Sequence, residues 1–68
     1  MITEIGIIAG DIWNYLEGQK SERSLSDMVK SIGKSRETIL MGLGWLAREG
    51  HVAINLTESG LFAKLISR

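Results

Sequence analysis

The residues most able to do chemistry gather in one short polar stretch. Lys34, Ser35, Arg36 and Glu37 follow a glycine, and two cations flank the serine hydroxyl. Lys34 and Arg36 can meet phosphate groups, and the guanidinium of Arg36 can pair with guanine. If Ser35 begins a helix, the free N–H groups of the first turn would offer a further phosphate site. The stretch predicts nucleic-acid contact, with solvated surface charges as the alternative.

Catalytic or metal chemistry finds little support in the sequence. His51 is the single histidine, and there is no cysteine to supply a disulfide or a thiolate ligand. The acidic residues are scattered, and no glycine-rich phosphate loop occurs. We therefore expect a protein that is not an enzyme and has no metal, cofactor or small-molecule ligand, with His51 at the entrance to a strand.

The length and net charge of the chain indicate what kind of domain it forms and which partners it could have. The chain has 68 residues, which we expect to form one domain over residues 1–68. Eight basic and eight acidic residues give a formal net charge of zero, whereas dedicated nucleic-acid binders are usually basic. A domain of this size is marginally stable by itself, and without disulfides a symmetric partner is a common support. A homodimer is therefore expected.

The N-terminal segment gives no sign of export. MITEIGIIAG has no basic residue before its apolar run, unlike a secretory signal. No apolar segment approaches the roughly 18 residues that a membrane helix needs. We expect a cytoplasmic protein without membrane contact.

Hydrophobic spacing predicts that the first helix covers residues 3–17 and ends at Gly18. Its apolar side chains recur every three or four residues and share one face, whereas Ile7 falls on the opposite, exposed face. Those of the apolar face are Ile5, Ile8, Ala9, Ile12 and Leu16.

Two further helices follow a polar loop and a short extended piece at residues 23–25. Ser26 is predicted to cap the second helix, which buries Met28, Val29 and Ile32 and ends at a left-handed Gly33. Ser35 is predicted to cap the third helix, residues 36–49, which Gly50 ends. The buried face of that helix is expected to centre on Ile39 and to include Leu43 and Leu46. The short connection between the two helices is typical of a helix-turn-helix.

The tail changes to a period of two, which predicts a hairpin. Val52, Ile54 and Leu56 alternate with smaller or polar residues, and Gly60 suits the left-handed position of a three-residue loop. Residues 61–67 would form the return strand. A terminal helix capped by Thr57 is the alternative. If Val52, Ile54, Leu56 and Phe62 face the core, the side chains that point outward are Leu61, Ala63 and Leu65.

Three helices followed by a hairpin is the order of the winged helix-turn-helix superfamily, an α+β fold whose pattern residues 24–54 match. Over nearly its whole length the chain resembles a family of very small prokaryotic winged helix-turn-helix proteins of unknown function. The segments that carry the resemblance are IGIIAGDIWNYL, SLSDMVKSIG and above all GLGWLAREG. The resemblance implies a C-terminal β-hairpin wing and leaves the activity open.

In the wider superfamily the third helix enters the major groove of DNA. Members that read DNA usually carry polar or basic side chains at the positions that correspond here to Leu40, Met41 and Gly44, with Trp45 at the edge of the same face. Exposed apolar groups of this kind are typical of an interface. The candidate interface residues are Ile7, Leu40, Met41, Gly44, Trp45, Leu61 and Leu65. For Trp45, packing on the first helix or the hairpin is the alternative.

The helix glycines point to close approaches. Gly42 lies beside the predicted core stripe and would admit the first helix or Trp13, whereas Gly44 points outward, where only a partner chain would need the space. Gly6 and Gly10 indicate either a close contact within the chain or a partner.

Two functions of different classes follow from these observations. One is a small regulator of transcription that binds double-stranded DNA through residues 34–37 as a homodimer. The other is a protein-interaction or dimerisation module whose third helix serves as an apolar interface.

Overall fold

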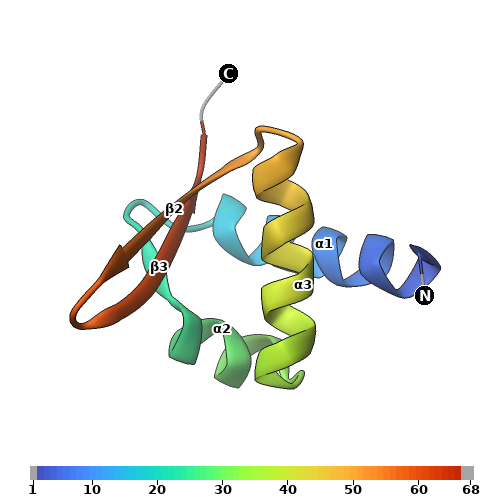
Figure 1. Ribbon diagram of the computed structural model, residues 1–68, viewed down its shortest axis with the longest axis horizontal. Helices are drawn as coiled ribbons and strands as arrows, with labels where there is room; N and C mark the ends of the chain where they lie inside the picture. Colours follow the sequence, from blue (N-terminus) through green and yellow to red (C-terminus); the bar gives the residue numbers. More distant parts are fainter. Residues whose placement is uncertain (1, 67–68) are drawn as a thin grey trace.

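The computed structural model describes residues 2–66 as three helices and a small antiparallel sheet (Figure 1). The elements in chain order are α1 (Ile2–Glu17), β1 (Arg23–Ser24), α2 (Leu25–Ile32), α3 (Arg36–Arg48), β2 (Val52–Thr57) and β3 (Gly60–Leu65). The predicted order of three helices and a C-terminal hairpin is confirmed, and the alternative of a terminal helix is wrong. Ser67, which was predicted to end the return strand, lies outside the described residues.

The N-cap of α2 is Ser24, and the prediction of Ser26 is wrong. The Ser24 hydroxyl oxygen accepts a hydrogen bond from the backbone N–H of Asp27 at 3.1 Å. The cap lies two residues earlier because the chain passes directly from β1 into the helix, so Leu25 is already helical and buried. Gly33 ends α2 with a φ of 78°, as predicted.

The predicted cap of α3 is confirmed. The Ser35 hydroxyl oxygen accepts a hydrogen bond from the backbone N–H of Thr38 at 3.1 Å. The helix ends at Arg48, one residue before the predicted end, because Glu49 is its C-cap. Gly50 follows with a φ of 79°.

The core forms where α1 crosses α3, with α2 and the hairpin closing two further sides (Figure 1). The buried stripes of α1 and α3 are confirmed, except that Ile5 is only partly buried. The buried apolar residues are Ile8, Ala9, Ile12, Leu16, Leu25, Met28, Ile39, Leu43, Leu46, Val52 and Ala63. In α2, Met28 is buried as predicted, whereas Val29 and Ile32 are half-buried.

Of the predicted close approaches at helix glycines, the structure confirms one and does not show the others. A Cβ on Gly42 would meet side chains of α1, so the close approach of the first helix is confirmed. At Gly6 and Gly10 an added Cβ would meet nothing within 4 Å, so the described residues make no close contact with these two glycines.

The hairpin closes with a loop one residue shorter than predicted. Thr57 pairs with Gly60, which leaves Glu58 and Ser59 as the loop. Gly60 is the first residue of β3 and not a loop residue as predicted, but its φ of 132° is positive, a value that favours glycine. The sheet order is β1-β3-β2, so β3 lies in the middle.

The register corrects the predicted faces of the return strand. Residues directly opposite one another in a sheet share a face, and Val52 pairs with Leu65 while Leu56 pairs with Leu61. Leu61 and Leu65 therefore share the face of Val52 and pack against the core, with Ala63 fully buried between them. The prediction that these three point outward is wrong, because the shorter loop shifts the return strand by one residue. Phe62 lies on the opposite face.

Candidate nucleic-acid interface

A small polar hollow lies where the starts of two helices meet the tip of the hairpin. Its volume is about 230 Å³. It is lined by Ser24, Leu25, Ser26, Arg36, Ser59, Gly60 and Leu61. The fold brings these segments together because β1 pairs with β3 and α2 packs on α3. Three serines and one guanidinium thus share an exposed concavity.

The predicted residues 34–37 are all exposed at the start of α3, but they do not point to one place. Arg36 lines the hollow beside the hairpin. Lys34 lines a separate hollow of about 350 Å³ between the N-terminal parts of α1 and α3, with Glu4, Ile7, Ile8 and Thr38. The Ser35 hydroxyl is engaged as the helix cap and also bonds the Thr38 hydroxyl at 2.7 Å. The side chains of Lys34 and Arg36 therefore lie on opposite sides of the start of α3.

Sequence reasoning missed Ser24, Ser26 and Ser59 as neighbours of Arg36. The helix-turn-helix pattern places α2 beside α3, so hydroxyls at the start of α2 could have been found. The position of Ser59 depends on the hairpin register, which the sequence did not fix.

The residues next in sequence to the lining of the hollow carry charges of both signs. Glu58 stands in the hairpin loop beside Ser59, and Glu37 follows Arg36. Arg23, at the start of the neighbouring strand, donates a hydrogen bond from its Nε to Gln19 Oε1 at 2.8 Å. The arrangement can hold one anionic group through Arg36 and hydroxyl donors, but it does not form an extended basic groove.

The outward face of α3 carries an apolar ridge, defined here as Leu40, Met41, Gly44 and Trp45. The exposed fractions are 37% for Leu40, 45% for Met41 and 42% for Trp45, as predicted. Trp45 is thus partly exposed and partly covered, as a position at the edge of this face would be. A Cβ on Gly44 would meet nothing within 4 Å. Ile7 on α1 is 62% exposed and shares its hollow with Thr38, one turn before the ridge.

Comparison with known proteins agrees with this geometry. Residues 1–65 match the family described as a winged helix-turn-helix domain (DUF2582). The chain belongs to this family. The hairpin of β2 and β3 is accordingly the wing of the domain.

A solved relative supports the same fold. The solution NMR structure of protein BT2368 from Bacteroides thetaiotaomicron is similar with a TM-score of 0.80 and 25% sequence identity. The similarity covers 93% of this chain and 76% of that chain. No curated protein matches the chain.

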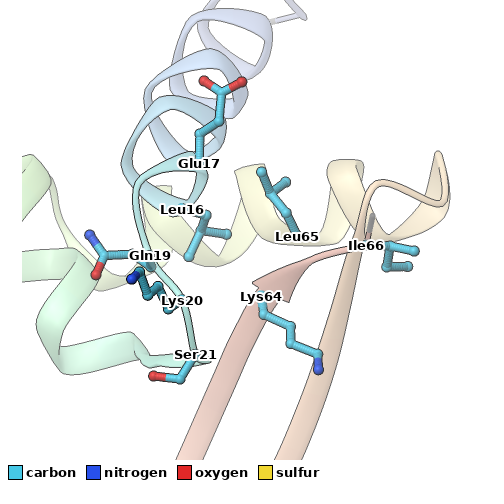
Figure 2. Close-up of a pocket in the computed structure, with 8 residues that line it drawn as sticks. All are labelled: Leu16, Glu17, Gln19, Lys20, Ser21, Lys64, Leu65 and Ile66. Carbon is cyan, nitrogen blue, oxygen red and sulfur yellow. The ribbon is translucent and has the colours of Figure 1, made fainter. Parts of the chain in front are cut away.

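A further hollow of this winged helix domain lies between the C-terminal end of α1 and the end of β3, with a volume of about 410 Å³. Its lining is Leu16, Glu17, Gln19, Lys20, Ser21, Lys64, Leu65 and Ile66. The side chains of Glu17 and Lys64 extend away from each other (Figure 2). These two charged groups therefore do not converge on one point of the hollow.

His51 lies directly before β2, as predicted, and its ring contacts Trp13 edge to face with centroids 4.9 Å apart. The imidazole is thus packed on an aromatic ring of the winged helix domain. Within residues 2–66, no three metal-binding side chains come together. In the same part of the chain, no helix is long and apolar enough to cross a membrane.

Proposed function

We propose that this winged helix domain binds double-stranded DNA and acts as a small, non-enzymatic regulator of transcription in the form of a homodimer. The observation that carries the proposal is the hollow that unites Arg36 with the start of α2 and the wing tip. A DNA backbone that crosses the start of α3 would meet this hollow. The role would be performed in the cytoplasm of a prokaryotic cell.

The chemistry of the hollow suits a backbone phosphate. A guanidinium gives charge-assisted hydrogen bonds to phosphate oxygens, and serine hydroxyls add neutral donors. Lys34 would reach a second phosphate from the other flank of the helix start. Contacts of this kind position a protein on DNA without reading its sequence.

The zero net charge supports a binding mode with few phosphate contacts. Each neutralised phosphate contributes about −0.9 to the slope of log affinity against log salt. If Lys34 and Arg36 supply the cationic contacts, we expect a slope of about −2 for each subunit. This is a shallow dependence for a DNA-binding protein.

Titration with duplex DNA at low salt tests the proposal by NMR. Amide resonances of residues 34–41 should shift, together with those of Ser24 and Ser59, and added salt should reverse the shifts. Resonances of the hollow at the end of α1, such as Gln19 and Lys20, serve as an internal control and should stay in place. An absence of shifts at sub-millimolar DNA contradicts the proposal.

A second candidate function is favoured by the apolar ridge. Leu40, Met41 and Trp45 occupy the face that would enter a major groove, yet they offer no hydrogen bonds to bases or phosphates. Apolar contact with thymine methyl groups is the only base readout open to Leu40 and Met41. The ridge would serve instead as a protein interface, for a second copy or another protein, as such exposed apolar faces commonly do.

The two functions respond differently to a charge on the ridge. Trp45→Glu and Met41→Glu alter exposed side chains and should leave the fold intact. If the ridge is an interface, light scattering should show that both variants lose the assembly that the unmodified protein forms. Retention of that assembly by both variants contradicts a self-associating ridge.

A further inference from the structure

The two edges of the sheet differ in how well they are protected. β1 is only two residues long and carries Arg23. β2 is six residues long, VAINLT, and contains neither a charged residue nor a proline. It has no neighbour on its outer side among residues 2–66. Natural proteins usually shorten, charge or cover such an edge, because open strands pair with other chains.

The register shows which backbone groups of β2 remain open. The N–H of Ile66 donates to the carbonyl oxygen of His51 at 2.9 Å, and these two residues continue the register of the hairpin. In an antiparallel pair, hydrogen-bonded and non-hydrogen-bonded positions alternate. Ala53, Asn55 and Thr57 are therefore bonded to β3. The N–H and carbonyl groups of the even-numbered Ile54 and Leu56 point to the open edge.

The same two residues also carry exposed apolar side chains. Ile54 is 40% exposed and Leu56 is 77% exposed, although both lie on the sheet face that Val52 presents to the core. Residues 2–66 cover Ile54 only in part and leave most of Leu56 exposed. The open backbone groups and the uncovered side chains thus belong to one short segment.

We propose that β2 pairs antiparallel with β2 of a second copy, with the two-fold axis at Asn55. This register sets Ile54 against Leu56 of the partner subunit, and Leu56 against Ile54 of the partner subunit. The outward N–H and carbonyl groups of both residues then find partners. Asn55 lies opposite Asn55 of the partner subunit, and the two side-chain amides can donate hydrogen bonds to and accept them from each other.

A second copy is the occupant because the edge is complementary to itself. Antiparallel pairing about a two-fold axis places β2 beside the identical strand of the second copy. Because β2 contains no charged residue, the two strands would not repel each other. The net charge of zero adds no repulsion between copies. Two joined wings would form one six-stranded sheet and leave β1, the protected strand, at both ends. This inference names the contact of the proposed homodimer, rests on that homodimer and does not depend on DNA binding.

Amide hydrogen exchange combined with native mass spectrometry, both without DNA, tests the pairing. The native mass should be that of a dimer. Ala53, Asn55 and Thr57 are the matched control, because β3 protects their N–H groups in either state. Ile54 and Leu56 should become protected as the protein concentration rises, by at least tenfold in exchange rate. A dimer in which Ile54 and Leu56 still exchange freely overturns the proposal, and so does a monomer at high concentration.

Substitution separates this edge from the apolar ridge. Leu56→Lys places a charge opposite Ile54 of the partner subunit, and its high exposure in the single chain keeps the fold intact. The dissociation constant of the dimer should rise at least tenfold. Met41→Lys is the control and should leave the dimer unchanged. The opposite outcome, a dimer with Leu56→Lys and a monomer with Met41→Lys, would assign the contact to the ridge. Because the mass is measured without DNA, failure of DNA binding would not affect the result.

Discussion

Gly42 of α3 lies directly against Ile12 of α1. A Cβ added to Gly42 would stand 2.7 Å from Ile12 Cδ1, and the same atom would stand 2.7 Å from Ile8 Cγ2. Carbon atoms in ordinary contact lie about 3.5–4.0 Å apart. The absent side chain therefore allows the two helices to cross closely, and this crossing holds the start of α3 in position beside α2 and the wing.

Gly42→Ala should destabilise the protein although alanine is the better helix former. Alanine gains about 1 kcal/mol over glycine in a helix interior. Overpacking of a filled core costs about 1–3 kcal/mol, and Ile12 is fully buried with little room to move. We expect a net loss of about 1 kcal/mol in the free energy of unfolding, measured by urea denaturation. An unchanged or higher stability would mean that α1 shifts freely, contrary to the packing described above.

Gly44→Ala is the matched comparison two residues further along the same helix. Apart from its chain neighbours and the backbone of α3 itself, no atom of the described residues lies within 4 Å of the added Cβ, so only the helix propensity changes. The free energy of unfolding should rise by about 1 kcal/mol in the same denaturation experiment. A loss of stability at low protein concentration would show that the outward face of α3 is not free in the single chain.

The helical part of the fold could be predicted because its signals are local. Apolar spacing placed the buried faces of α1 and α3, and Ser35 and Gly33 marked a cap and a helix end that the structure confirms. The exposure of the ridge could be predicted from the same helical period. Once Ile39 is placed at the centre of the buried face, the period assigns Leu40, Met41 and Gly44 to the outward face.

The sheet could not be predicted to the same depth because it depends on pairing between distant residues. One residue in the loop length decides which face Leu61 and Leu65 take, and the sequence allowed both lengths. The cap of α2 depended on the same pairing, since β1 forms against β3 and sets where the helix begins. The divergence of Lys34 and Arg36 is a further result of packing, because neighbours on both sides decide which hollow each side chain lines.

Ser24→Ala and Ser26→Ala should separate a helix cap from a nearby serine. Loss of the Ser24 hydroxyl removes the hydrogen bond from the Asp27 N–H, which should lower the free energy of unfolding by about 1 kcal/mol. Ser26 lies inside the first turn and is exposed, so its replacement should change stability by less than about 0.5 kcal/mol. Thermal denaturation of both variants gives the comparison. Equal effects, or a larger effect at Ser26, would contradict the observed cap.

Arg36→Ala should weaken DNA binding by removing one phosphate contact. The slope of log affinity against log salt should become shallower by about 1, and the affinity for unrelated duplexes should fall to a similar degree. Arg48→Ala is the control, because Arg48 is also an exposed arginine of α3 but lies at its other end, away from the wing hollow. Fluorescence anisotropy with a labelled duplex at several salt concentrations measures both quantities. An equal change of slope in the two variants would show that the helix attracts DNA through general charge, and that the hollow formed by Arg36, the start of α2 and the wing tip is not a phosphate site.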